Sequence, residues 1–126
     1  MKTIVNTPEA PAPIGPYSQA VTFGNTLYTS GQIAIDPQTS ELVSGAIEEE
    51  TERVMQNLKA VVDAAGYSME NIVKCTIFIK DMNDFGSINS IYGSYFNDET
   101  APARETVEVA RLPKDVRVEI SCIAVK

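Results

Sequence analysis

Arg104 is the residue whose type and setting first suggest chemistry. It lies in PARETVEVARLPKD, residues 102 to 115, two places after Pro102 and just before the alternation that predicts a half-buried strand from Val107 to Ala110. A guanidinium presents a planar fork that matches a carboxylate with two parallel hydrogen bonds. Because rigid neighbours limit its freedom, Arg104 would lose little entropy on binding. This setting predicts a carboxylate clamp, although a surface arginine at a strand end has the same local pattern.

Glu119 is the second candidate, and it lies inside the last predicted strand. Alternation places it on the same strand face as Ile123 and Val125, so this carboxylate is expected to be partly buried. A partly desolvated carboxylate is a better proton acceptor than an exposed one. Beside a bound substrate it could orient or deprotonate a water, although a glutamate in a strand often only faces solvent.

Four further residues could complete a polar pocket. Tyr17 follows a Gly-Pro pair that fixes its direction, and Ser30 and Gly31 offer a hydroxyl and an unobstructed backbone N–H. Asn89, in a predicted helix, could cap, pack or reach a pocket. Each of these signals is weak alone, because core or surface roles account for the same residue types.

The absence of histidine restricts the chemistry most. It excludes Ser-His and Cys-His nucleophilic pairs and imidazole metal sites. The two cysteines, Cys75 and Cys122, are too few for a thiolate zinc site and are expected to be free and buried. No glycine-rich phosphate-binding motif is present. We therefore predict no metal and no cofactor, with acid-base work left to carboxylates, tyrosines, lysines or water.

Charge and composition limit the partners. The net charge is −7 and the basic residues are scattered, so we predict no nucleic-acid binding, which depends on neutralising phosphates. No apolar run approaches the roughly 18 residues of a membrane span, so we predict no membrane insertion. The start, MKTIVNTPEAPAP, lacks the basic and apolar regions of a signal peptide. The sequence therefore predicts a cytoplasmic protein.

The elements that must position these residues form one domain, residues 1–126. Proline-rich TPEAPAPIGPY should run irregularly over the surface, and Gly24-Asn25 should close a hairpin. Hydrophobic periodicity and turn residues predict the following elements: strands at 2–6, 19–23, 26–30 continuing through 31–35, 71–80, 105–110 and 116–125, and helices at 47–65 and 84–96. The order predicts an α+β fold, one mixed sheet with two helices on one face.

The first helix and the last strand carry two further patterns. Glu48, Glu49 and Glu50 crowd the first turn of the first helix, where they complement its dipole and should be solvated. In the last strand, Val116, Val118, Ile120, Cys122 and Ala124 should pack under the helices. The other face of that strand is half apolar, which is typical of a surface covered by another subunit, and it predicts a homo-oligomer.

Several segments together resemble one family. GPYSQA, YTSGQIAIDPQT, NLKAVVDAAG, KCTIFIKDMNDF and PARETVEVARLPKDVRVEI closely resemble the RidA family, also called YjgF, from about residue 8 to the C-terminus. The resemblance implies a small enamine/imine deaminase that converts 2-iminobutanoate and 2-iminopropanoate to 2-keto acids and ammonia. It also implies a chorismate-mutase-like fold and a homotrimer, with sheets lining a central β-barrel and active clefts between subunits.

The resemblance also implies roles for individual residues. Arg104 would grip the substrate carboxylate and Glu119 would hold the attacking water, while Tyr17, Ser30, Gly31, Asn89 and Thr106 fall on cleft positions. Glu105 and Thr106 replace a common Ser-Cys pair, and alternation should send Glu105 away from Arg104. Two other functions remain open: a non-catalytic sensor of small carboxylates, and an RNA-directed nuclease or translation inhibitor.

Overall fold

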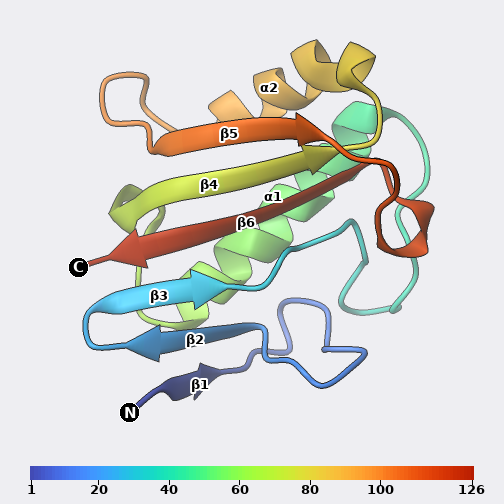
Figure 1. Cartoon of the computed structure of the whole chain (residues 1–126). Coiled ribbons are helices and arrows are strands. Elements are labelled where there is room, and N and C mark those ends of the chain that lie inside the picture. The colour runs from blue at the N-terminus through green and yellow to red at the C-terminus, as the bar shows by residue number, and fades with distance from the viewer.

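A six-stranded mixed sheet with both helices on one face forms the protein, and the computed structural model describes residues 1–126 (Figure 1). The elements are β1 Thr3–Val5, β2 Ala20–Phe23, β3 Thr26–Thr29, α1 Ile47–Ala64, β4 Ile72–Ile79, α2 Phe85–Gly93, β5 Ala103–Glu108 and β6 Val118–Val125. The strand order is β1-β2-β3-β6-β4-β5. This architecture confirms the predicted α+β class, the mixed sheet and the two helices on one face.

Only one pair of neighbouring strands is parallel. β4 and β5 run in the same direction and are connected through α2, whereas all other neighbours are antiparallel. The predicted hairpin joins β2 to β3 through Gly24 and Asn25. Gly24 has φ +62°, a conformation that glycine adopts without steric cost.

The main core lies between the sheet and the helices. Val54, Leu58 and Val61 recur at helical spacing on α1 and are completely buried. They pack against inward side chains of the central strands, among them Ile77 of β4 and Ile120 of β6. Burial of each such side chain stabilises the fold by about 1.5–3 kcal/mol.

β4 departs from simple alternation at its start. Simple alternation along the predicted strand at 71–80 places Val73 on the core-facing side with Cys75, Ile77 and Ile79, but Val73 is 47% exposed while Ile72 is buried. The pairing with β6 shifts register between Ile72 and Lys74. This bulge rotates the first residues of the strand, so the prediction for Val73 was wrong.

β5 begins earlier than predicted and lies at the edge of the sheet. It spans Ala103–Glu108, so Arg104 lies within the strand and Ala110 lies beyond it. Val107 and Glu108 are exposed, because β5 has a neighbour on only one side. The prediction of a half-buried strand from Val107 to Ala110 was therefore wrong in both bounds and burial.

Two predictions about burial also needed correction. Val116 precedes β6 and packs in a smaller cluster with Ile33, Ile35 and Leu112, not under the helices. Glu50 is 5% exposed, and its carboxylate accepts hydrogen bonds from the Arg117 Nε and backbone N–H, both at 2.8 Å. Only its neighbours in the glutamate run are solvated.

The second helix is shorter than the predicted 84–96, and Asp81, a residue type that favours helix N-caps, lies one turn too early to cap it. Asp81 accepts a hydrogen bond from the Asn83 N–H and so caps the 3₁₀ turn Met82–Asp84 that precedes α2.

Residues 31–35 do not extend β3 as a regular strand. They make isolated bridges instead, Gln32 with Ile120 and Ile35 with Leu42. The buried Asn57 amide of α1 supports this segment by donating to the carbonyls of Ile33 and Ile35.

The sheet face opposite the helices carries exposed apolar side chains. Pairing registers place Ile4, Phe23, Tyr28, Ile123 and Val125 on this face. The first three are about half exposed or more, at 53%, 61% and 47%. No helix of the chain is long and apolar enough to cross a membrane.

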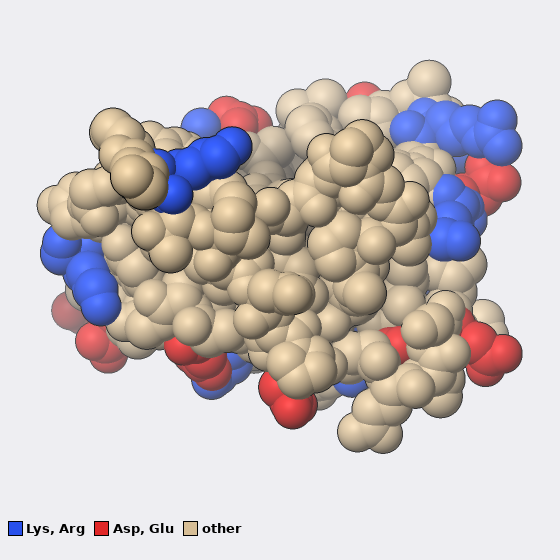
Figure 2. Space-filling view, turned by 90° about the horizontal axis from the view of Figure 1, so that it is seen from below, with Lys and Arg blue, Asp and Glu red and all other residues tan.

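The edge of the molecule that carries β1 is poor in charge. Figure 2 views the molecule from this side, with Lys, Arg, Asp and Glu lying mostly around the margins of a broad uncharged surface. Exposed Ile4 belongs to β1, and exposed Ile14 and Tyr17 belong to the nearby proline-rich segment. This side therefore has no continuous basic surface.

Candidate functional site

The Arg104 side chain lies against one stripe of α2. Its Nη1 donates to Asn89 Oδ1 at 2.5 Å, and its guanidinium carbon lies 5.6 Å from the Phe85 ring centre and 5.1 Å from that of Tyr92. Positions 85, 89 and 92 are spaced i, i+4 and i+7, so they share a helix face. We call these four residues the arginine cluster.

This arrangement leaves most of the guanidinium free. Only one hydrogen bond, to Asn89, is made by the side chain, and Arg104 is exposed. Two cation–π contacts and this bond hold the group in place. The remaining N–H groups can donate to both oxygens of a carboxylate without reorganisation.

Glu105 and Thr106, the two residues after Arg104, point to opposite faces of the sheet. Glu105 points to the opposite sheet face, where it lies 3.1 Å from Lys74 Nζ and accepts a hydrogen bond from Thr76 at 3.0 Å. These contacts lower the pKa of Glu105, the Lys74 bond most strongly. Thr106 shares the Arg104 side, and its buried hydroxyl has no hydrogen-bond partner in the chain. The charge that Glu105 adds is therefore directed away from the Arg104 guanidinium.

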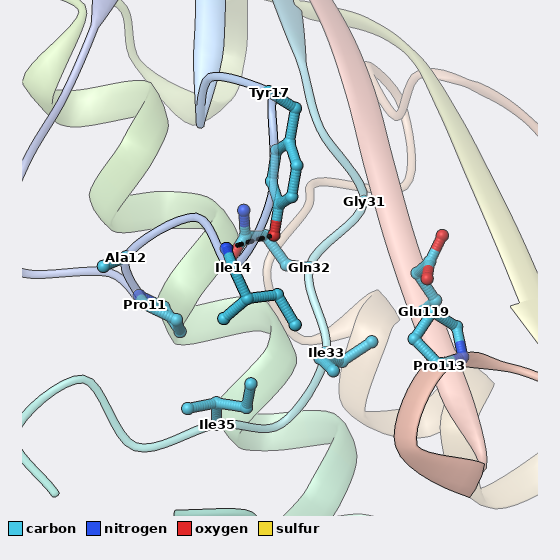
Figure 3. A pocket seen from close by; sticks show the side chains of 10 residues that line it. All are labelled: Pro11, Ala12, Ile14, Tyr17, Gly31, Gln32, Ile33, Ile35, Pro113 and Glu119. Carbon is cyan, nitrogen blue, oxygen red and sulfur yellow. Dashed lines mark hydrogen bonds between the residues drawn. The ribbon is translucent and has the colours of Figure 1, made fainter. Parts of the chain in front are cut away.

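Glu119 lies in a separate pocket with Tyr17 and Gly31 (Figure 3). A Cβ at Gly31 would lie 2.7 Å from Glu119 Cδ and 2.9 Å from its Cγ, so only glycine permits this contact. We call this the glutamate pocket. Its lining residues are Pro11, Ala12, Ile14, Tyr17, Gly31, Gln32, Ile33, Ile35, Pro113 and Glu119.

The polar groups of the glutamate pocket are available for a ligand. The Glu119 carboxylate makes no hydrogen bond or ion pair within the chain, and its partial burial raises its pKa. The Gly31 N–H has no partner either. The Glu119 carboxylate, with its raised pKa, can take a proton from a water, and the Gly31 N–H beside it can donate to a polar ligand.

Tyr17 and Ser30 differ in what they can offer. The Tyr17 hydroxyl accepts a hydrogen bond from the Ile14 N–H at 3.4 Å, which leaves its own proton free to donate (Figure 3). The Ser30 hydroxyl donates to the Ser18 carbonyl at 2.5 Å. Ser30 can therefore accept a hydrogen bond from a ligand, but its proton is already engaged.

The arginine cluster and the glutamate pocket lie on opposite faces of the sheet. Pairing places Arg104 beside Cys75 and Cys75 beside Cys122, all on the helix side. Glu119 precedes Cys122 by three residues and so projects from the other face. Within one chain, the residues predicted to act together are divided into two groups: Arg104, Asn89 and Thr106 in one, and Tyr17, Gly31 and Glu119 in the other. Ser30 directly precedes Gly31 but does not line the glutamate pocket.

The two cysteines are free and buried, as predicted, and lie opposite one another across β4 and β6. Burial raises the pKa of both thiols, that of Cys122 to about 12. Thiols of this kind are poor nucleophiles at neutral pH. No group of three or more His, Cys, Asp or Glu side chains is arranged to hold a metal ion.

Comparison with known proteins identifies the family. A family model described as Endoribonuclease L-PSP matches residues 7–126. The chain is 52% identical over 124 residues to a 2-iminobutanoate/2-iminopropanoate deaminase of Dermatophagoides farinae, covering 98% of this chain and 96% of the relative. This chain belongs to the RidA family.

Solved structures of the RidA family agree with this assignment. A Rid family protein of unknown function from Yersinia pestis, YyfA, superposes with a TM-score of 0.96 at 48% identity, covering 100% of both chains. E. coli TdcF with bound serine superposes with a TM-score of 0.92 at 46% identity, covering 98% of both chains. The fold is therefore that of the family along its whole length.

Sequence reasoning missed the aromatic part of the arginine cluster. The apolar period of the predicted helix at 84–96 places Phe85 and Tyr92 on one stripe, but their contact with Arg104 was not foreseen. The helical spacing of Phe85, Asn89 and Tyr92 contained the signal, because it places all three on one face. The apolar lining residues Ile33, Ile35 and Pro113 had no comparable signal, since separate loops bring them together.

Proposed function

We propose that this protein hydrolyses 2-imino acids, 2-iminobutanoate and 2-iminopropanoate among them, to 2-keto acids and ammonia. Two observations carry the proposal: a guanidinium held in place with free donors, and a half-buried glutamate with a raised pKa and no partner in the chain. The guanidinium can bind the carboxylate of the substrate, and the glutamate can activate the water that must attack the imine carbon. The deaminase relative, 52% identical, supports the same activity.

A complete site then requires two copies of the chain. Since Arg104 and Glu119 project from opposite sheet faces, we propose that Arg104 of one copy reaches the glutamate pocket of the next. Family resemblance favours a homotrimer whose sheets enclose a central barrel. The exposed apolar residues on the open face, such as Phe23 and Tyr28, support burial against another copy.

The proposed mechanism begins with orientation. Arg104 pairs with the substrate carboxylate, and the Gly31 N–H and Tyr17 hydroxyl donate to its oxygens or to the developing polar centre. Ser30 accepts from the substrate N–H, because its own proton is engaged by Ser18. Fixing the imine carbon near Glu119 converts attack by water into a step within a complex.

Proton transfer then balances the reaction. Glu119 takes a proton from water as the oxygen bonds to the imine carbon, the C=N electron pair moves to nitrogen, and the nitrogen then takes that proton from Glu119. The resulting carbinolamine collapses: its hydroxyl proton moves through Glu119 to the nitrogen, a C=O bond forms, and the C–N bond breaks to release ammonia. A single proton relay of this kind typically accelerates a reaction by about 10²–10⁴-fold.

The test is an assay with freshly generated imine. A pyridoxal-dependent threonine dehydratase supplies 2-iminobutanoate, and appearance of the keto acid is followed with and without this protein. We predict that wild-type protein accelerates the step and that Arg104→Ala abolishes the acceleration, because the carboxylate loses its clamp. Lys59→Ala, which removes a cation from the exposed side of α1, is the control and should retain full activity.

Unchanged turnover in Arg104→Ala would contradict the proposed site. The family description also contains the word endoribonuclease, so the same samples should be incubated with RNA. The net charge of −7 opposes accumulation of a polyphosphate chain on this surface. RNA cleavage that disappears in Arg104→Ala, without imine hydrolysis by the wild type, would replace the deaminase proposal.

A further inference from the structure

Gln19 is a buried side-chain amide whose hydrogen bonds all go to one irregular segment. It is 1% exposed, and its Oε1 accepts from the Thr7 N–H at 2.7 Å. Its Nε2 lies 3.0 Å from the Thr7 carbonyl, 3.2 Å from that of Ala10 and 3.0 Å from that of Pro11. One side chain therefore satisfies four backbone groups between residues 7 and 11.

The segment around these contacts has few other means of keeping its shape. It lies between β1 and β2 without helix or strand, and its prolines at positions 8, 11, 13 and 16 have no N–H to donate. Its buried carbonyls need donors from elsewhere, because an unsatisfied buried polar group is costly. Gln19 supplies those donors.

This segment is also one wall of the glutamate pocket. Four of the ten lining residues belong to it: Pro11, Ala12, Ile14 and Tyr17. Figure 3 shows Tyr17 and Ile14 on this wall, facing the strand that carries Glu119. The conformation of residues 7–17 therefore sets where the Tyr17 hydroxyl lies relative to the carboxylate.

The backbone of Gln19 reaches the opposite wall. Its carbonyl accepts a hydrogen bond from the Ser30 N–H at 2.9 Å, next to the Ser30 hydroxyl bond to Ser18. Ser30 directly precedes Gly31, the residue in contact with Glu119. Gln19 thus joins the proline-rich wall, through its side chain, to the Ser30-Gly31 wall, through its main chain.

We propose that Gln19 is a positioning residue for the reaction, acting through Tyr17 and the Ser30-Gly31 pair without touching the substrate. This inference rests on the proposed function, because the reaction uses the glutamate pocket. Because the buried Gln19 amide is fully hydrogen-bonded, its desolvation is compensated, and its bonds hold residues 7–17 in one conformation. Misplacement of a positioning group by about 1 Å can cost about 10²-fold in rate.

Two substitutions separate shape from hydrogen bonding. Gln19→Met keeps the length of the side chain and removes all four hydrogen bonds. Gln19→Glu keeps the acceptor for the Thr7 N–H but loses the donors and directs a charge at three carbonyls. We expect both to lower kcat/KM by about tenfold to a hundredfold while far-UV circular dichroism stays that of the wild type.

Thr51→Val is the matched control for loss of a buried hydrogen bond. Thr51 is fully buried, and its hydroxyl donates to the Ile47 carbonyl at 2.8 Å inside α1, away from the pocket. We expect a lower thermal midpoint but wild-type kcat/KM. If Gln19→Met lowers activity no more than Thr51→Val does, the residue is merely structural and the proposal is wrong.

A double-mutant cycle tests the positioning role directly. Tyr17→Phe removes the hydroxyl that Gln19 is proposed to place, so Tyr17→Phe added to Gln19→Met should cause little further loss. Independent, additive losses would overturn the coupling. Hydrogen exchange of the Thr7 and Ser30 amides, measured without substrate, should be faster in Gln19→Met.

The two proposals can fail separately in this experiment. If wild-type protein does not accelerate imine hydrolysis, the proposed function fails, whereas the exchange measurement still reports whether Gln19 holds both walls. If the wild type is active and neither the kinetics nor the exchange responds to Gln19→Met, the proposed function survives and the positioning role is refuted.

Discussion

Gly31 and Glu119 are matched to one another at the scale of single atoms. The carboxylate occupies the space that a Cβ at position 31 would need, with Cδ only 2.7 Å from it. We predict that Gly31→Ala displaces the carboxylate and lowers kcat by about tenfold or more. Gly93→Ala is the control, since nothing lies within 4 Å of a Cβ there. Wild-type turnover in Gly31→Ala would show that the placement of Glu119 is not needed.

Glu119 should impose a pH dependence on the reaction. Its burial raises the pKa, so the basic form is lost at a higher pH than for an exposed glutamate, whose ordinary value is 4.5. We predict that kcat/KM rises with pH through this shifted value and then levels off. Glu119→Gln should remove that limb and reduce kcat far more than it changes KM. A change in KM alone would argue against a role in activating water.

The same shift predicts an opposite effect on stability. A carboxyl whose folded pKa is raised favours the folded state at pH values below its unfolded pKa. That contribution is lost as pH rises through the folded pKa. At neutral pH the buried charge therefore opposes folding, and Glu119→Gln should unfold at a higher temperature than the wild type. Thermal denaturation of both proteins at pH 7 measures this difference in unfolding temperature.

At the scale of elements, α2 holds the Arg104 side chain in place. Its stripe of Phe85, Asn89 and Tyr92 holds the guanidinium before any ligand arrives. We predict that Asn89→Ala raises KM by about tenfold with a smaller effect on kcat, because a looser arginine pays more entropy on binding. Asn83→Ala is the control, since Asn83 lies in the turn before α2. Equal KM values in the two variants would contradict this role for α2.

Most elements were predictable from hydrophobic period and turn residues. α1 lies within one residue of its predicted end, and the Gly24-Asn25 hairpin is present. The exceptions have physical causes. A register shift at Ile72 and Lys74 exposes Val73, and β5 starts at Ala103 because pairing with β4, not alternation of side chains, defines an edge strand. Neither the register shift nor the strand pairing is visible in the local sequence pattern.

The sequence suggested residues for the candidate site but not their geometry. Residue type and family resemblance together selected Arg104 and Glu119, yet a sequence does not state which sheet face a residue occupies relative to a distant strand. The pairing registers place these two on opposite faces. The buried amide of Gln19 also escaped notice, because its partners are backbone atoms of a proline-rich segment.

At the scale of the whole molecule, the proposed activity would be a property of an assembly of copies. If Arg104 of one copy acts on the substrate held at Glu119 of another, two inactive chains can complement one another. A chain with Arg104→Ala retains Glu119, and a chain with Glu119→Gln retains Arg104. One interface of each mixed trimer would then combine both intact residues.

The measurement that tests this account most directly is turnover by mixed oligomers of Arg104→Ala and Glu119→Gln, co-expressed and purified through different tags. Each variant alone should be inactive. Each purified mixed trimer would have one intact site of three, so the mixed trimers should show about a third of the wild-type rate of imine hydrolysis. Confirmed mixed oligomers that remain as inactive as their parents would contradict a site shared between copies.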